Sequence, residues 1–158
     1  VMVSRTGAVL LEADAVDAYR RLLLPLAELL TPNLHEARLL ANCAIDSPTD
    51  VERAAALLLE LGPSAVLIKG GGLPELRGRD YLLDTTGVGR WLLHGAVETL
   101  DTHGTGCTLG AAITAHRARG LSLESAVRAA KAYVEGALRN ALAIGAGQGP
   151  LCHWHLLL

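Results

Sequence analysis

The hydrophobic and polar positions of this chain fall into helical and strand-like patterns that alternate along the sequence. Apolar residues recur at helical spacing in five segments, and short apolar runs of strand length lie between them. The predicted helices are Ala13–Leu24, Leu34–Ala41, Thr49–Leu61, Gly106–Arg119 and Ser122–Ala143. The predicted strands are Val1–Val3, Ala27–Leu30, Ala65–Ile68, Tyr81–Asp84 and Arg90–Leu93.

Turn and capping residues mark several of these boundaries. Ser47-Pro48-Thr49 opens the third helix, and Gly62-Pro63 closes it. Gly120 ends the fourth helix, and Ser122 is suited to cap the fifth. The residues between the last two strands form a turn, which predicts a hairpin or flap there. A polar turn is expected at Ser4–Gly7, and the segment after Gly145 is glycine-rich and irregular.

Strands that alternate with helices predict an α/β layer fold with a mostly parallel sheet. A length of 158 residues fits one domain, which we expect to span residues 1–158. Ligands of such sheets bind beyond the carboxyl ends of the strands. Asn33, Lys69 and Gly104 each follow an apolar strand-like run, so we expect them at the same end of the sheet.

Composition narrows the function classes. Apolar residues make up 51% of the chain, enough for a core, but Phe is absent, so Leu, Val and Ala must fill it. A formal net charge of −2 gives no general attraction to nucleic acid or to an anionic membrane. The sequence contains neither a membrane-spanning apolar run nor the apolar region of a signal peptide. Three scattered cysteines, Cys43, Cys107 and Cys152, indicate reduced thiols and a cytoplasmic location.

Residues 102–110 carry the clearest chemical signal. They read Thr-His-Gly-Thr-Gly-Cys-Thr-Leu-Gly and stand where a helix begins. Helix N-termini present unpaired N–H groups and a positive dipole end, and glycine allows close approach of a ligand. We interpret Gly104–Cys107 as a phosphate site, although a tight turn with a small buried cysteine is the alternative. A thiol at a helix start ionises readily, so Cys107 is a candidate catalytic base.

Asn33 and Glu36 allow two interpretations. Asn33 can cap the following helix, with Glu36 three residues later completing a capping box that needs no further function. The same pair can lie near a hydrated Mg²⁺ on nucleotide phosphates, with the carboxylate acting through water. The two interpretations are compatible, because a cap would fix the geometry that the metal needs.

Lys69 is unusual because the chain otherwise uses Arg for nearly all its positive charge. It follows a buried strand and precedes three glycines, so a cation on a bound phosphate is favoured over a solvated loop lysine. At the other end of the chain, Cys152, His153 and His155 suggest zinc. They lack a fourth ligand and a standard spacing, so a packed or frayed tail is the favoured interpretation.

Several motifs in this order resemble the hydroxymethylpyrimidine and phosphomethylpyrimidine kinase family of thiamine biosynthesis, within the ribokinase-like superfamily. The likeness runs through essentially the whole chain. The matching segments are Val1–Ser4 with Gly7, Leu24–Ala27, Leu30–Asn33 with Glu36, Val66–Gly71, Thr102–Leu109, Glu124–Val127, Ala130–Val134, and Gly147–Leu151 with His153.

This resemblance implies a ribokinase-like fold and an ATP- and Mg²⁺-dependent kinase. Such a kinase phosphorylates a pyrimidine alcohol, 4-amino-5-hydroxymethyl-2-methylpyrimidine, and then converts the monophosphate to the diphosphate. The family pattern makes Cys107 catalytic and assigns the anion hole to Gly104, Thr105 and Gly106. It also implies that Lys69 and Thr102 contact the nucleotide and that Asn33 and Glu36 belong to the metal motif. Homodimers are also what the family suggests.

The chain departs from the family pattern in several places. An Asp-Pro pair would precede Val1, together with about a hundred residues that hold the first strands and most of the pyrimidine pocket, judged from the usual domain sizes. Gly72, Asp101 and Gly110 replace residues that are commonly His, Asn and Ser. We therefore expect the C-terminal part of such a kinase, with an exposed apolar sheet edge that a partner surface would cover.

Two other functions remain open at this point. Pyridoxal kinase shares the superfamily, and some of its members have the cysteine-containing anion loop. The second alternative is a non-catalytic nucleotide-binding remnant, which keeps the phosphate loop but lacks the substrate pocket.

Overall fold

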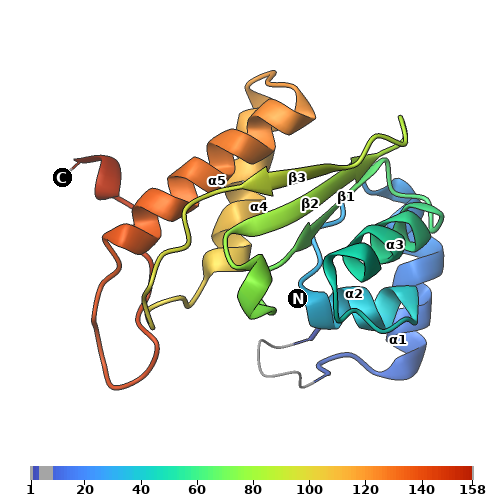
Figure 1. Ribbon diagram of the computed structural model, residues 1–158, viewed down its shortest axis with the longest axis horizontal. Helices are drawn as coiled ribbons and strands as arrows, with labels where there is room; N and C mark the ends of the chain where they lie inside the picture. Colours follow the sequence, from blue (N-terminus) through green and yellow to red (C-terminus); the bar gives the residue numbers. More distant parts are fainter. Residues whose placement is uncertain (1, 4–8, 158) are drawn as a thin grey trace. The chain divides into compact units, whose positions relative to one another are not determined.

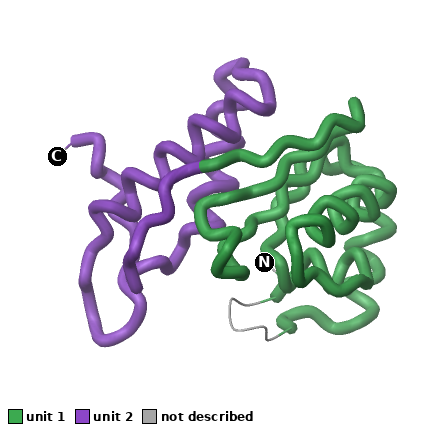
Figure 2. Tube along the Cα trace, in the orientation of Figure 1, with its two compact units in different colours: residues 1–93 green, residues 94–158 purple. Residues whose placement is uncertain are grey.

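The computed structural model describes residues 2–3 and 9–157. These residues divide into two compact units, 1–93 and 94–158 (Figure 2). The expected turn at Ser4–Gly7 lies outside the described residues. The expectation of a single domain stays a prediction.

The first helical segment of residues 1–93 consists of three kinds of helix in succession. An α-helix, α1, covers Ala13–Ala18, a π-helical turn, η1, covers Tyr19–Leu23, and a 3₁₀ turn, η2, covers Leu24–Leu26. The sequence predicts one helix over Ala13–Leu24. Helical backbone does run through that range, but Pro25 has no N–H to donate and the chain leaves the helix at Ala27.

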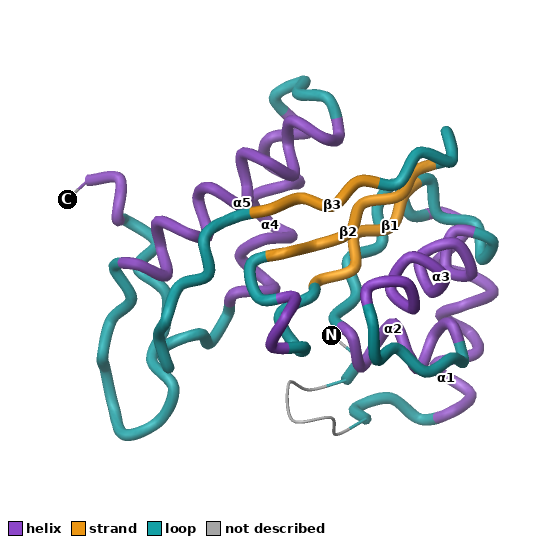
Figure 3. The backbone as a smooth tube through the Cα atoms, in the orientation of Figure 1, coloured by secondary structure: helices purple, strands orange, loops and turns teal. Residues whose placement is uncertain are grey.

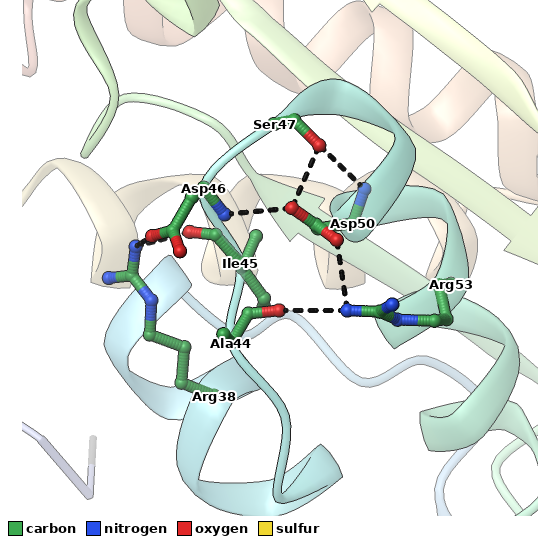
Figure 4. Close-up of polar contacts among 7 residues, drawn as sticks. All are labelled: Arg38, Ala44, Ile45, Asp46, Ser47, Asp50 and Arg53. Atoms are coloured by element: carbon green, nitrogen blue, oxygen red, sulfur yellow. Dashed lines mark hydrogen bonds and ion pairs between the residues drawn. The ribbon is translucent and has the colours of Figure 1, made fainter.

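Two capped helices follow in the same unit. The helix α2 covers Leu34–Ala41, as the sequence predicts, and α3 covers Pro48–Leu59. Ser47 caps α3, since its Oγ accepts a hydrogen bond from the Asp50 backbone N–H at 3.2 Å. The Asp50 carboxylate in turn accepts from the Ser47 hydroxyl at 2.8 Å, from the Asp46 N–H at 3.1 Å and from Arg53 at 2.9 Å (Figure 4).

The sheet has three strands in the order β1-β2-β3: Ala65–Lys69, Arg79–Asp84 and Arg90–Leu93 (Figure 1). Both pairings are antiparallel, so the expectation of a mostly parallel sheet is not met by these strands. The reason is the length of the connections. A parallel crossover needs about a dozen residues or more, whereas residues 70–78 join β1 to β2.

Parallel pairing occurs in this unit only as isolated bridges between described residues. Leu30 pairs with Val66, and Asn33 pairs with Lys69. The predicted strand Ala27–Leu30 therefore forms no named strand, but its end and the following residues lie beside β1. Backbone bonds from Leu30 N to Ala65 O, 2.9 Å, and from Leu67 N to Leu30 O, 2.8 Å, hold it there.

The core of residues 1–93 lies between the sheet and its helices. The helices α2 and α3 pack on each other, and both contact β1 (Figure 3). Aliphatic side chains fill the space, as the absence of Phe requires. The largest fully buried residues of this unit are Leu24, Leu34, Leu40, Ile45, Val51, Leu58, Leu67, Ile68, Leu76, Leu82 and Leu92.

Residues 94–158 are built on a pair of packed helices. The helix α4 covers Thr105–Ala118, and α5 covers Leu123–Arg139, with Ser122 as its cap. Gly120, at φ +87°, makes the turn between them. The helix α5 ends four residues before the predicted Ala143. The C-terminal segment returns to the pair, where Leu151 and Cys152 are buried, so the expected packed tail is confirmed for these residues.

None of the described helices combines the length and the apolar character that a membrane crossing requires. The three cysteines are free thiols: Cys107 is exposed, Cys43 is half-buried and Cys152 is buried.

The Asp50 network predicts a pH dependence of stability. Hydrogen bonds from Ser47 and then from the Asp46 backbone hold the pKa of Asp50 below its ordinary value of 3.8. A lowered carboxyl pKa contributes stability that is fully present above the ordinary value and lost as pH falls through the folded-state pKa. Urea unfolding of Asp50→Asn should therefore give a weaker loss of unfolding free energy between about pH 4 and pH 2 than the parent chain.

Ser47→Ala provides the matched test, because it removes the largest cause of the shift and leaves the carboxylate in place. It should reduce the acid sensitivity in the same direction as Asp50→Asn. An acid sensitivity equal to that of the parent chain in both variants would contradict the assignment.

Candidate functional site

Asn33 and Glu36 form a complete capping box at the start of α2. The Asn33 Oδ1 accepts from the Glu36 backbone N–H at 2.9 Å, and the Glu36 Oε2 accepts from the Asn33 N–H at 2.9 Å. The capping interpretation is therefore confirmed. The metal role of the same two residues stays a prediction.

The Glu36 carboxylate also binds the N-terminal segment. Its Oε1 accepts from the Met2 N–H at 2.9 Å and, at the long distance of 3.5 Å, from the Val3 N–H. The Asn33 side-chain amide donates to the Val3 carbonyl at 3.4 Å. Only 7% of Glu36 is exposed, so these backbone donors compensate the cost of burying its charge.

Lys69 lies beside Asn33, as the last residue of β1. The two residues pair in a parallel bridge, and the Lys69 N–H donates to the Pro32 carbonyl at 3.0 Å. Because the segment 30–33 and β1 run in the same direction, Asn33 and Lys69 lie at the same end of this parallel pairing. The structure thus brings the predicted residues Asn33, Glu36 and Lys69 together within residues 1–93.

Sequence reasoning missed the residue opposite Lys69. Asp80 is the register partner of Lys69 on β2, and it is 8% exposed. Its Oδ1 accepts from the Gly70 N–H at 3.1 Å, which orders the turn that follows Lys69. Gly70 is required there, because a Cβ would lie 2.3 Å from the Arg79 carbonyl oxygen. The available signal was the position of Asp80, directly before the apolar run 81–83 of a predicted strand.

The predicted phosphate loop lies in the other unit and leads into α4. Gly104 is the N-cap residue, with φ +86°, a left-handed conformation that glycine adopts at little cost. The Thr105 hydroxyl donates to the Thr102 carbonyl at 2.7 Å, and the Thr108 N–H donates to the Gly104 carbonyl at 2.9 Å. The helix starts at Thr105, one residue before the predicted Gly106.

The first turn of α4 differs from the starts of the other long helices. Side chains cap α2, α3 and α5, whereas no described side chain caps α4. Gly106 and Cys107 are exposed, while Leu109 and Ile113 turn the opposite side of the helix into the interior. The first N–H groups of a helix have no carbonyl partner within the helix. The Thr105 N–H donates to the Thr102 carbonyl at 3.4 Å, outside the helix, and the N–H groups of Gly106 and Cys107 are placed to donate to an anion.

An open groove of about 550 Å³ begins at this turn. Cys107 and Thr108 line one end of it, and it continues along three alanines of α4 toward His116, Tyr133 and His153. The predicted catalytic thiol therefore lies both at the start of the helix and at the surface of a groove. Periodicity alone gave no indication of this groove, because His153 reaches it from the C-terminal segment.

The predicted site residues form two groups in the structure. One group comprises Asn33, Glu36 and Lys69, and the other comprises Thr102, Gly104, Thr105, Gly106 and Cys107. The groups belong to different units of the chain. Their expected meeting at one end of the sheet stays a prediction.

The contacts of Glu36 predict a large effect of its removal on stability. Glu36→Ala leaves the buried Met2 N–H and the partly buried Asn33 N–H without their acceptor, which should reduce the unfolding free energy by about 2–4 kcal/mol. Asn33→Ala should cost about 1 kcal/mol, as loss of a helix cap usually does. His35→Ala, an exposed position in the same turn, is the control for urea unfolding. Equal stability of the Glu36 and His35 variants would contradict the carboxylate's structural role.

Known proteins share both the sequence and the fold of this chain. The sequence profile described as phosphomethylpyrimidine kinase matches residues 1–152. A hydroxymethylpyrimidine/phosphomethylpyrimidine kinase of Synechococcus elongatus is 51% identical over 158 residues, which cover 99% of this chain and 60% of that protein. A thiamine biosynthetic bifunctional enzyme of Arabidopsis thaliana is 41% identical over 98% of this chain and 30% of its own length.

A solved structure of a related kinase is also similar to this chain. The pyridoxal kinase of Staphylococcus aureus in complex with AMP-PCP and pyridoxal matches with a TM-score of 0.87 and 32% identity, over 95% of this chain and 56% of that one. This chain thus spans about three fifths of the length of the Synechococcus relative. Its fold is the α/β fold of these kinases, and the chain belongs to the phosphomethylpyrimidine kinase family.

Proposed function

We propose that this chain carries the phosphate-binding and catalytic part of an ATP-dependent kinase that phosphorylates hydroxymethylpyrimidine and then its monophosphate. The observation that carries the proposal is the first turn of α4. Its Gly106 and Cys107 are exposed, no described side chain caps it, and it lies within the segment Thr102–Thr108. The Synechococcus relative, at 51% identity, supports the same reaction.

The backbone of the α4 turn would stabilise the group in transfer. Phosphoryl transfer spreads negative charge over the equatorial oxygens of the moving group. Preorganised N–H groups of Gly104, Thr105 and Gly106, at the positive end of the helix dipole, are suited to hold that charge. Thr102 lies one turn earlier and would contact the nucleotide through its hydroxyl.

Cys107 would act on the acceptor alcohol. A thiolate at this position can remove the hydroxyl proton as the oxygen attacks the γ-phosphorus and the bond from that phosphorus to the bridging oxygen of ADP breaks. ADP then leaves, and the proton resides on sulfur. The second phosphorylation uses a phosphate oxygen that is already ionised and needs little help from a base. Cys107 should therefore matter more for the first step than for the second.

A second group of residues would bind the nucleotide and its metal ion, namely Lys69, Asn33 and Glu36. Lys69 supplies a cation to its phosphates, with the following glycines allowing close backbone approach. The Glu36 carboxylate already accepts up to three backbone N–H groups, which leaves room for about one further donor among its lone pairs. This donor set fits water-mediated contact to Mg²⁺, which keeps several of its waters. The ion would offset the phosphate charge.

Two heteroaromatic alcohols are candidate substrates, a pyrimidine and pyridoxal. The Synechococcus relative favours the pyrimidine, and the Arabidopsis enzyme is named for thiamine biosynthesis. The pyridoxal kinase of Staphylococcus aureus, at 32% identity, makes pyridoxal the alternative.

We further infer a cytoplasmic location and a homodimer. Analytical ultracentrifugation would measure the oligomeric state.

Calorimetric titration and a substrate panel test the proposal together. The chain should bind the nonhydrolysable nucleotide AMP-PCP with Mg²⁺, and Lys69→Ala should weaken binding about ten-fold through loss of a phosphate contact. Arg77→Ala, in the exposed turn before β2, is the control. Phosphate transfer from ATP should favour hydroxymethylpyrimidine over pyridoxal. Absence of nucleotide binding would overturn the proposal, and binding without transfer to either alcohol would favour a non-catalytic nucleotide-binding protein.

The Cys107 role makes a second prediction. Cys107→Ala should lower kcat for the free alcohol about 10²-fold or more, because it removes the proton acceptor, and should affect phosphorylation of the monophosphate much less. Cys43→Ala, a thiol in the other unit, is the matched control in both assays. An unchanged rate with the free alcohol would remove Cys107 from the mechanism.

A further inference from the structure

A carboxylate just before the phosphate loop is bonded to the C-terminal segment. The Asp101 Oδ1 accepts from the Gly149 backbone N–H at 2.7 Å, across 48 residues of sequence. The Gly149 carbonyl in turn accepts from the His103 N–H at 3.2 Å. His103 and Pro150 also pair in a parallel bridge. Two reciprocal bonds therefore hold Gly149 beside residues 101–103, immediately before Gly104.

The C-terminal segment is itself fixed on α5. The Leu142 N–H donates to the Pro150 carbonyl at 3.0 Å, and the Cys152 N–H donates to the Ala137 carbonyl at 3.1 Å. Leu151 and Cys152 are 1% and 0% exposed. The bond from the Gly149 N–H to Asp101 thus connects the residues before α4 with a hydrogen-bonded and partly buried part of residues 94–158.

Gly149 is fitted closely to this contact. A Cβ at that position would lie 2.6 Å from the Asp101 Oδ1 and 2.1 Å from the Leu142 carbonyl oxygen. Any larger residue would push the carboxylate and the backbone apart. The same connection can therefore be broken from either side, at residue 101 or at residue 149.

We propose that Asp101 is a positioning residue, which acts through its bond to Gly149 and holds the Gly104 turn in the geometry that binds the transferred phosphoryl group. Preorganised donors lose their advantage when they must be ordered during the reaction. A small displacement of the turn should therefore reduce turnover more than it reduces substrate binding. The catalytic part of this inference rests on the proposed function, whereas the ordering of the turn does not.

Amide hydrogen exchange tests the ordering directly. The Thr108 N–H bonds to the Gly104 carbonyl and reports on the turn, and the Ala126 N–H, bonded to the Ser122 carbonyl at 2.8 Å, is the internal control. Asp101→Ala and Gly149→Ala should each speed exchange at Thr108 about ten-fold, the effect of losing one charge-assisted hydrogen bond, and leave Ala126 unchanged. Asp101→Asn keeps an acceptor oxygen without the charge and should restore most of the protection at Thr108.

Steady-state kinetics tests the catalytic part. Asp101→Ala should lower kcat about ten-fold with little change in KM for the alcohol, and Asp101→Asn should recover most of the loss. Glu124→Ala removes an exposed carboxylate that pairs with Arg128 on α5, and is the matched control. Parent-like exchange at Thr108 in both Asp101→Ala and Gly149→Ala would overturn the inference, as would an Asn variant as impaired as the Ala variant.

These outcomes separate the two proposals. A parent chain that neither binds nucleotide nor transfers phosphate, with faster Thr108 exchange in Asp101→Ala, would refute the proposed function and leave the ordering role supported. A parent chain that is active, with kcat unaffected by Asp101→Ala, would refute the positioning role alone.

Discussion

The buried carboxylate of Glu36 is the interaction on which the candidate site of residues 1–93 depends. It accepts backbone N–H groups from the N-terminal segment and from the capping residue Asn33. A charge that is only 7% exposed is tolerated in a low-dielectric interior when backbone donors surround it. The capped start of α2 is thereby fixed beside the end of β1, where Lys69 stands.

A similar arrangement occurs in residues 94–158. There the Asp101 carboxylate accepts the Gly149 N–H, next to the uncapped start of α4. In each unit, an acidic side chain accepts hydrogen bonds from backbone N–H groups near the predicted site residues. None of these bonds involves an N–H group of the α4 turn. The proposed function assigns N–H groups of that turn to a phosphate ligand.

Local sequence signals predicted the elements that depend on short-range chemistry. The capping box at Asn33 and Glu36 forms as the sequence indicates, because its bonds join residues three positions apart. The helix Leu34–Ala41 and the strand Arg90–Leu93 have the predicted bounds. Predictions that depend on contacts between distant segments were less accurate. The sheet pairs antiparallel, and the run Ala27–Leu30 contributes only a bridge to Val66, since pairing direction depends on connections and partners and not on the pattern of one strand.

The sequence by itself determined the chemistry of the candidate site: the glycines and Cys107 at a helix start, the cap at Asn33, and Lys69 at a strand end. These follow from residue types and spacings that act within one or two turns of chain. Only the tertiary structure decided which distant groups join them, such as Asp80 opposite Lys69 and Gly149 against Asp101. Those contacts arise when packing brings separate segments within hydrogen-bond distance, and no local pattern encodes that distance.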